Sequence, residues 1–477
     1  IDLVINGNDD ENIELRPRDE IIVFSKETKK ILNDEANSIP DEDILEYKLE
    51  ELIQRCFIKP TRNTSSMNDI DLANSLIEAV QRVSYSEVTQ LIDAGANVNF
   101  ARTDGSTALS WAAQRPDVQI VAALLSAGAN PNSVDENNET PLLLASARGN
   151  EQTVDALIAS GANIDVRRWS GDTSLHAAVH GGNSNVLLAL IEQGADVNAI
   201  DSRMGQSPLM RAVASGKREI ASTLIANGAN VNAASSNGFR AIHFAALYGQ
   251  RNIASILVDA GADTQIAGGE VSSPFLIALS EGYEEIARLL LTDSVNVNAR
   301  NTDGTTPLHE ASGAGMTELV RDLVERGAEL DARLDEIPGN VYEPGRGGGT
   351  TPLLAAARGG HVATMKLLLS AGANPHDQSI DGAGSVQFAT RRLNFEAVRL
   401  LVELGADVNA APPNRPTALH TAIRFGEDEI VEYLANNGAD FDVRDHNSRT
   451  PLEEAEFEAP THTIELMRRL VTIRPNG

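Results

Sequence analysis

Histidine and cysteine are the residue types in this sequence that could hold a metal ion or serve as a catalytic base or nucleophile. The 477 residues contain nine histidines and one cysteine, Cys56, which excludes a disulfide framework and a cysteine-based zinc site. The histidines show no spacing typical of metal ligands or of a nucleophile–base pair. The faint exception is Ser174-Leu175-His176, which has the residue types of a hydrolytic dyad.

One glycine-rich stretch has the residue types of a phosphate-binding loop. Residues 345–350 read Gly-Arg-Gly-Gly-Gly-Thr and precede a predicted helix, whose first backbone amides could bind an anion. No Lys-Ser/Thr pair follows the glycines and no strand leads into them, as a P-loop requires. We therefore predict a flexible loop here, no cofactor, no metal site and no enzymatic activity.

Charge and hydropathy exclude two further classes of function. The chain has 39 basic and 68 acidic residues, so its net charge is −29, and such a field repels nucleic-acid phosphates. No apolar run approaches the ~20 residues of a membrane span. We expect neither nucleic-acid binding nor membrane insertion.

Composition divides the chain near residue 67. Five of the seven lysines lie in residues 1–67, which indicates two structural units, residues 1–67 and residues 68–471. In the first unit, residues 13–15 and 21–24 predict two short strands, and residues 41–58 predict an amphipathic helix. Residues 12–23 look like part of the β-grasp modules of polysaccharide export proteins. The alternative is a cap that covers the apolar flank of the second unit.

The second unit is periodic. A Gly-Ala signature recurs in ten places, followed by Asn or Asp in nine of them and by Glu329 in the tenth. Ser294 fills an eleventh, and eight of the ten intervals equal 33 residues. Openings such as Thr306-Pro307-Leu308-His309 precede the signatures. This pattern resembles the ankyrin repeat family over residues 68–471, in about twelve repeats. The resemblance implies a mainly α fold: a solenoid of paired helices with projecting β-hairpins, here with a small N-terminal α/β appendage.

Each motif residue has a physical task in such a repeat. Threonine caps the first helix, proline fits its first position, and the glycine ends the second helix in a left-handed conformation. We expect Ser294 to be strained in that conformation, and we expect the opening at Gly384 to be weak because its threonine is lost. These departures predict the least stable repeats at residues 264–296 and 378–394. They also predict that Gly384→Thr together with Ser385→Pro would raise the stability of the C-terminal repeats.

The resemblance also implies roles for individual residues. The histidines of the opening motif would bond within and between repeats; they are His176, His243, His309 and His420. Partners would bind the concave face of the inner helices, the hairpin tips, and a 12-residue insertion within residues 334–346. Candidate residues on the inner helices are Arg115, Arg148, His180, Leu247, Tyr248, Arg358, Arg391, Arg392, Arg424 and Phe425. Those on tips are Trp169, Arg203 and Phe239, and those in the insertion are Tyr342 and Arg346.

The function predicted from these residues is a non-catalytic scaffold that binds another protein or a peptide, for which an acidic stretch would complement the arginines. One alternative is the non-catalytic arm of a cell-envelope export or assembly system, docked through residues 1–67. A second alternative is an enzyme with ankyrin substructure. Long ankyrin proteins that bacteria export are similar, and the chain does not begin with Met. We therefore expect an exported, periplasmic protein, with a cytoplasmic location as the alternative.

Overall fold

The computed structural model describes residues 69–265, 272–335, 348–413 and 415–473. The chain divides between Leu72 and Ala73 into two units. The strands, the helix and the β-grasp-like module predicted in residues 1–67 lie outside the described residues, as do Tyr342 and Arg346. The boundary near residue 67 stays a prediction.

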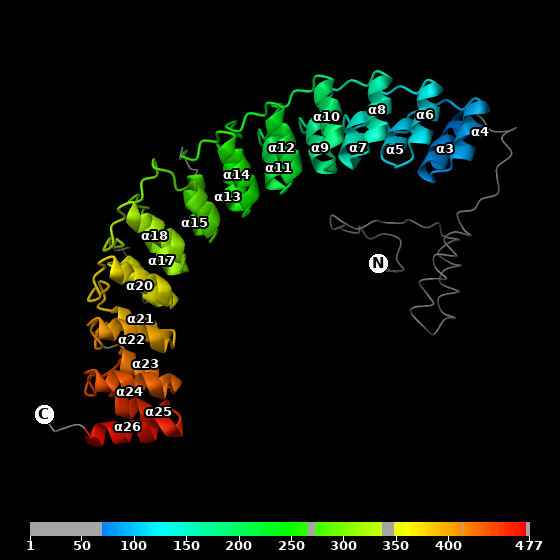
Figure 1. Cartoon of the computed structure of the whole chain (residues 1–477). Coiled ribbons are helices and arrows are strands. Elements are labelled where there is room, and N and C mark those ends of the chain that lie inside the picture. The colour runs from blue at the N-terminus through cyan, green and yellow to red at the C-terminus, as the bar shows by residue number, and fades with distance from the viewer. Residues whose placement is uncertain (1–68, 266–271, 336–347, 414, 474–477) are drawn as a thin grey trace, which may run out of the picture. The chain divides into compact units, whose positions relative to one another are not determined.

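Twelve helix pairs follow one another along the described residues (Figure 1). The first helices of the pairs are α3 (Asp69–Gln81), α5 (Ala108–Ala113), α7 (Pro141–Arg148), α9 (Ser174–Gly181), α11 (Pro208–Ala214), α13 (Ala241–Leu247), α15 (Pro274–Ser280), α17 (Pro307–Ala314), α19 (Pro352–Gly359), α21 (Ser385–Arg391), α23 (Ala418–Phe425) and α25 (Pro451–Glu458). The second helices are α4 (Tyr85–Asp93), α6 (Val118–Ser126), α8 (Glu151–Ala159), α10 (Ser184–Glu192), α12 (Arg218–Ala226), α14 (Arg251–Asp259), α16 (Glu284–Leu290), α18 (Thr317–Glu325), α20 (Val362–Ser370), α22 (Phe395–Glu403), α24 (Asp428–Asn436) and α26 (Thr461–Ile473). The predicted repeat solenoid is confirmed.

Neighbouring pairs stack first helix on first helix and second on second, as α7 contacts α9 and α6 contacts α8. Small buried residues such as Ala145 and Ala178 let the first helices approach closely, and Leu157 and Leu190 fill the layer of second helices. Each repeat thereby covers the apolar face of the next.

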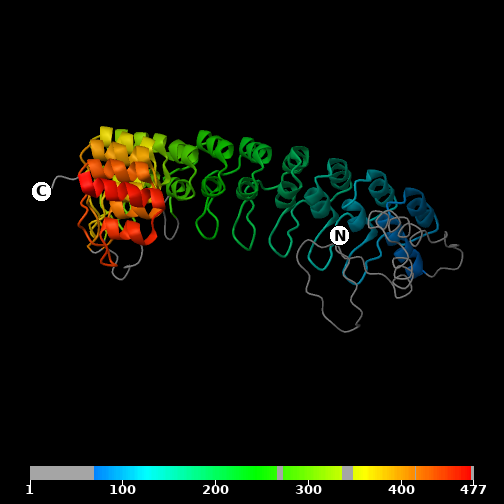
Figure 2. The same ribbon diagram turned by 90° about the horizontal axis from the view of Figure 1, so that it is seen from below.

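Hairpin loops link the repeats and project from one side of the helix layers (Figure 2). Within the described residues their ladder pairing is limited to two isolated bridges, Ala101–Thr107 and Gln378–Gly384. Most hairpins are therefore tight turns closed by a few hydrogen bonds, as where the N–H of Asp445 donates to the Arg449 carbonyl and the N–H of Ser448 donates to the Asp445 carbonyl, both at 2.9 Å.

Asparagine amides join consecutive hairpins. Asn132 donates from Nδ2 to the carbonyl oxygen of Gly161 at 3.0 Å, and its Oδ1 accepts from the backbone N–H of Asn163 at 2.7 Å. The same two-bond clamp is made by Asn99, Asn198, Asn232, Asn298 and Asn409. At four other seams the clamp position holds Asp165, Gln265, Asp331 or His376.

The motif histidines join the first helices. In His309, Nδ1 lies 2.8 Å from the Thr306 hydroxyl, and Nε2 donates to the Thr350 carbonyl of the next repeat at 3.0 Å. His176 and His420 make the equivalent bonds. Burial lowers the pKa of all three imidazoles below their ordinary value. The predicted structural role is confirmed for His176, His309 and His420; in His243, Nδ1 accepts from the Arg240 N–H at 3.1 Å, a bond within its own repeat.

Two expectations about weak repeats are wrong. Ser294 does not adopt a left-handed conformation: α16 ends at Leu290, and the N–H of Thr292 donates to the Leu290 carbonyl, so the chain leaves the helix by an earlier turn. Gly384 lacks a side-chain cap as expected. A Cβ there would, however, lie 2.6 Å from Cβ of Ala410, so Gly384→Thr would clash and not stabilise.

In the second of these repeats the strain lies instead at Leu393, which the sequence pattern did not reveal. Its φ is +55°, where most other repeats place glycine, as at Gly360 and Gly426. A left-handed conformation disfavours a residue with a Cβ.

We predict that Leu393→Gly raises the free energy of unfolding by roughly 0.5–1 kcal/mol, because it relieves a left-handed strain of about 1–2 kcal/mol and loses some chain entropy. Chemical denaturation measures this change. Leu404→Gly is the control, since Leu404 ends α22 with a φ of −91° and its replacement should destabilise. Equal destabilisation by Leu393→Gly and Leu404→Gly would contradict the inference that the backbone is strained at Leu393.

We predict that Asn132→Ala lowers stability by about 1 kcal/mol, because two inter-repeat hydrogen bonds are lost. Hydrogen exchange at the Asn163 amide should quicken, since that amide donates to Asn132. Asn137→Ala, on an exposed tip in the same hairpin, should leave exchange at Asn163 unchanged. Unaltered exchange in Asn132→Ala would show that the clamp contributes nothing.

We predict that stability falls as pH drops below about 6.5, the unfolded pKa of histidine. The folded pKa values of His176, His309 and His420 are lowered, so the unfolded chain binds protons first, and the stabilisation is complete only above that pH.

A triple His→Gln variant is the matched control, because Gln387 already makes this seam bond to the Pro416 carbonyl at 2.6 Å. Melting temperatures between pH 7.5 and 5.5 should depend on pH less steeply in the variant. Identical slopes would assign the pH dependence to other groups.

Candidate functional site

The described residues hold no constellation for catalysis or metal binding. They contain no group of three or more His, Cys, Asp or Glu side chains placed to hold a metal ion. Ser174 has no hydrogen-bond partner for its hydroxyl, and His176 is bonded to Thr173 and Gln206, so the faint dyad does not form. None of the described helices combines the length and apolarity needed to cross a membrane.

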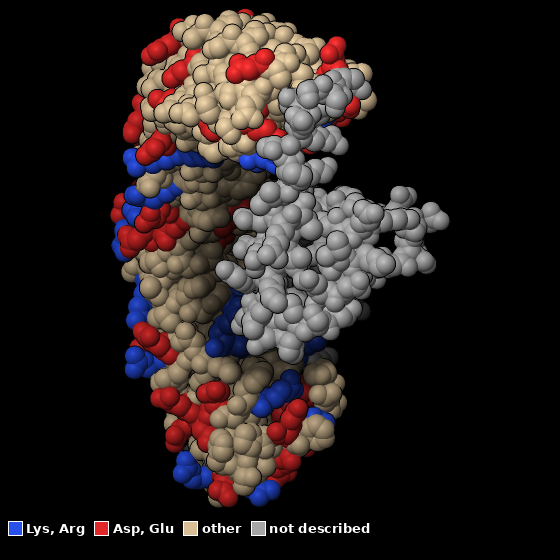
Figure 3. All heavy atoms as spheres, turned by 90° about the vertical axis from the view of Figure 1, so that its right-hand side faces the viewer, with Lys and Arg blue, Asp and Glu red and all other residues tan. Residues whose placement is uncertain are grey.

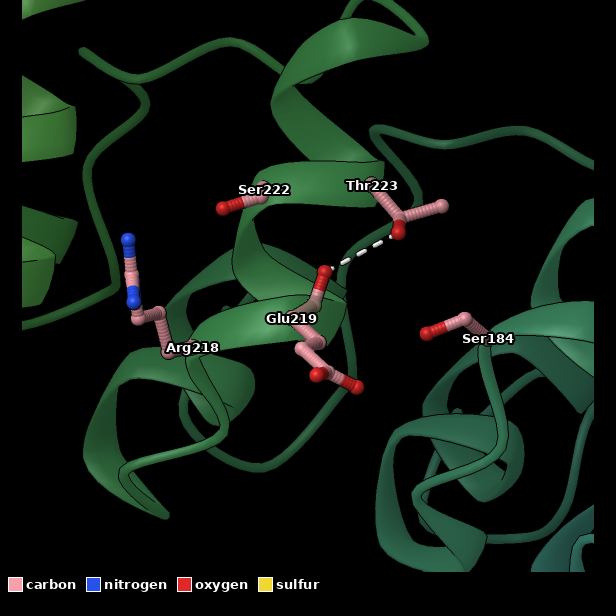
Figure 4. Close-up of a pocket in the computed structure, with 5 residues that line it drawn as sticks. All are labelled: Ser184, Arg218, Glu219, Ser222 and Thr223. Atoms are coloured by element: carbon pink, nitrogen blue, oxygen red, sulfur yellow. Dashed lines mark hydrogen bonds between the residues drawn. The ribbon is translucent and has the colours of Figure 1, made fainter.

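An open depression of about 490 Å³ lies between α10 and α12 (Figure 4). It is lined by Ser184, Arg218, Glu219, Ser222 and Thr223. The Thr223 hydroxyl donates to the backbone carbonyl of Glu219 at 2.9 Å, and no nucleophile–base pair is formed there. The depression contains none of the predicted site residues.

Exposed apolar side chains concentrate on the hairpins of three consecutive repeats. Trp169 is 80% exposed, Ile200 52%, Met204 50% and Val134 46%. We call these four residues the tip patch. Elsewhere on the described hairpins, the large apolar side chain with comparable exposure is Ile380.

Backbone hydrogen bonds connect the hairpins that hold the tip patch. The N–H of Trp169 donates to the Asn137 carbonyl at 3.4 Å, and the N–H of Ser202 donates to the Ser170 carbonyl at 2.9 Å. The Met204 carbonyl accepts from Ser236 at 2.8 Å. The tips are therefore held in register from one repeat to the next.

Arginines surround the tip patch. Arg168 forms an ion pair with Glu139 at 2.7 Å. Arg167 donates to the carbonyl of Ile200 at 2.9 Å and has no ion pair with a carboxylate among the described residues. Arg203 is exposed, and its side chain has no ion pair with a described residue. Phe239 is half-buried, with its ring centroid 5.4 Å from that of His243, so it packs within its own repeat.

On the inner helices, some candidate arginines are already engaged. Arg424 forms ion pairs with the buried carboxylate of Glu454 at 2.5 Å and with Glu458 at 3.8 Å. Arg392 donates from Nε to the Arg358 carbonyl at 2.6 Å, and Arg358 is itself engaged in an interaction.

Sequence reasoning missed Arg211, whose guanidinium bridges Asp172 at 2.6 Å and Asp201 at 2.9 Å. Its repeat position is that of Trp111 and Leu144, so the repeat alignment alone could have placed it on the inner face. Its two carboxylates make it part of the seam between repeats.

Three inner-helix candidates, Arg115, Arg148 and Arg391, have neither an ion pair nor a side-chain hydrogen bond with a described residue. Arg148 is exposed and Arg115 is half-buried. Arg391 is also half-buried, with its guanidinium carbon 5.9 Å from the ring centroid of Phe388.

The other inner-helix candidates lie at the ends of their helices. Tyr248 and Phe425 are exposed and Leu247 is half-buried. His180 is exposed, and its backbone carbonyl accepts from Lys217 at 2.6 Å. On the face shown in Figure 3, basic and acidic side chains are interspersed, so charge there is local and not uniform.

A match to a known protein family agrees with this architecture. A family model described as ankyrin repeats (three copies) matches residues 76–168, 109–201, 142–235, 175–268, 267–333, 337–412 and 388–472. The ankyrin repeat domain of Bcl-3, described as a unique member of the IkappaB protein family, aligns at a TM-score of 0.41 and 29% identity, over 46% of this chain and 98% of that one.

Similar sequences belong to proteins of different kinds. Alpha-latroinsectotoxin-Lt1a of Latrodectus tredecimguttatus is 33% identical over 24% of this chain and 8% of the toxin. Ankyrin repeat and SOCS box protein 11 of Danio rerio is 33% identical over 24% of this chain and 39% of that protein. The chain thus matches less than half the length of either. Because the family model covers most of residues 76–472, the chain belongs to the ankyrin repeat family.

Proposed function

We propose that this protein is a non-catalytic scaffold that binds another protein or a peptide through the tip patch and the inner-helix face. Ankyrin repeats are generally protein–protein interaction modules. The observation that carries the proposal is the exposure of Trp169 beside Ile200 and Met204 on hairpins held in register.

Trp169 has the properties of an interaction hot spot. Tryptophan can bury ~150–250 Å² on association, and tryptophan and arginine are enriched among the residues that dominate binding energy. Arg203 and Arg167 stand on the same or the adjacent hairpin. Because backbone bonds hold the hairpins before a partner arrives, little conformational entropy would be lost on binding.

The chemistry of the partner follows from the exposed charges. The uncompensated arginines on the tips and inner helices favour a partner with an acidic stretch. The inserted loop with Tyr342 and Arg346 lies outside the described residues, and its role in binding stays a prediction. The export-arm alternative depends on residues 1–67, also outside the described residues, and nothing in the comparisons supports it. The exported location likewise stays a prediction.

We predict that Trp169→Ala weakens capture of the natural partner by about 2 kcal/mol or more, roughly 30-fold in Kd, the scale of a hot-spot residue. The immobilised full chain would first capture proteins from its native source, identified by mass spectrometry. Titration of the purified partner then gives the Kd of each variant.

Ile380→Ala is the matched control, because Ile380 is an exposed apolar side chain (60%) on a hairpin outside the tip patch. Its Kd should stay within about twofold of wild type. The tip patch would be rejected as the binding surface if Trp169→Ala and Ile380→Ala bound alike.

A further inference from the structure

Arg391 differs from Arg211 and Arg424, two other arginines of the inner helices, because its charge has no carboxylate partner among the described residues. Arg211 pairs with Asp172 of the preceding repeat and Asp201 of its own, and Arg424 pairs with Glu454 and Glu458 of the following repeat. Arg424 occupies the same repeat position as Arg391, one repeat later. Arg391 forms no hydrogen bond or ion pair from its guanidinium to any described residue, and its contact there is with the ring of Phe388.

The charges that face Arg391 do not compensate it. Asp381 on the preceding hairpin attracts it, but that carboxylate accepts a hydrogen bond from the Ser379 hydroxyl and does not reach Arg391. Arg415 on the following hairpin repels it. Burial, reinforced by Arg415, lowers the pKa of Arg391 below its ordinary value.

A role at the helix end does not account for this arrangement. A basic residue in the last turn of α21 does interact favourably with the helix dipole, but the exposed Arg392 directly after it supplies such a charge. A half-buried guanidinium without a carboxylate is unfavourable unless a partner compensates it. The Phe388 ring centroid lies 5.9 Å from the guanidinium carbon of Arg391, and the guanidinium N–H groups have no hydrogen bond to a described residue.

We propose that Arg391, supported by Arg415, is a receptor for a glutamate or aspartate side chain in an acidic peptide segment of the partner. This inference rests on the proposed scaffold function and names the chemistry that its inner-helix face selects. A planar guanidinium binds a carboxylate through two parallel hydrogen bonds. Phe425, exposed at the end of the neighbouring helix α23, would contact an apolar side chain beside that acid.

The test uses the full chain and two fluorescein-labelled octapeptides, one of glutamates with a central phenylalanine and one with every glutamate replaced by glutamine. Fluorescence anisotropy should show that the glutamate peptide binds at least about tenfold more tightly than the glutamine peptide. Its affinity should fall as salt rises, because salt screens charge. Absence of binding by the glutamate peptide would overturn the proposal.

Variants separate the receptor from general attraction between charges. Arg391→Gln should weaken the glutamate peptide by about tenfold or more. Arg399→Gln removes the same charge from the exposed outer helix α22 of the same repeat and should change the affinity by less than about twofold. Equal weakening by both variants would overturn the assignment.

Arg391→Lys keeps the charge but loses the planar guanidinium that makes two parallel hydrogen bonds. The affinity of this variant for the glutamate peptide should therefore lie between those of wild type and Arg391→Gln. Circular dichroism melts would establish that each variant is folded. The inference can fail alone: if Arg391→Gln binds the glutamate peptide as wild type does while capture of the natural partner still depends on Trp169, the scaffold function stands and the carboxylate receptor is rejected.

Discussion

The seam between neighbouring repeats is the constraint on which the rest of this structure depends. Each pair of short helices exposes an apolar face that it cannot bury alone, so Leu157 or Leu190 becomes core only when the next repeat is in place. Polar bonds then fix the register of that apolar contact. The motif histidines connect the first helices and the asparagine clamps connect the hairpins. These bonds between repeats thereby fix the positions of the residues at the hairpin tips.

Periodicity made most of the fold predictable from the sequence. The spacing of glycines located the helix ends, and the Thr-Pro-Leu-His openings located the helix starts, because caps and left-handed turns depend on local residue types. Errors arose where a tertiary contact or a changed turn mattered. Gly384 is required by the approach of Ala410, 26 residues later. The strain at Leu393 was missed because the glycine that it replaces belongs to a less regular motif.

The sequence identified residues of the candidate site, but it did not reveal which of them already have a partner within the protein. Trp169 and Arg203 stood out because hairpin tips normally carry small polar residues, and both are exposed. Arg391 and Arg424 looked equivalent, since they share a repeat position. They differ because Glu454 and Glu458 of the following repeat reach Arg424, and a single repeat pattern does not reveal which neighbour supplies a carboxylate.

The asparagine clamp also bears on how such an array can change its length. It contacts only backbone atoms of the following repeat, as Asn132 does with Gly161 and Asn163. A duplicated or transplanted repeat would therefore meet a compatible neighbour without any compensating substitution. Seams held by specific side-chain pairs, such as Arg211 with Asp172 or Arg288 with Asp322, would tie particular repeats to each other. Repeat gain and loss should thus be easiest at clamped seams that lack such pairs. Repeats that are joined by a specific side-chain pair should be inherited together.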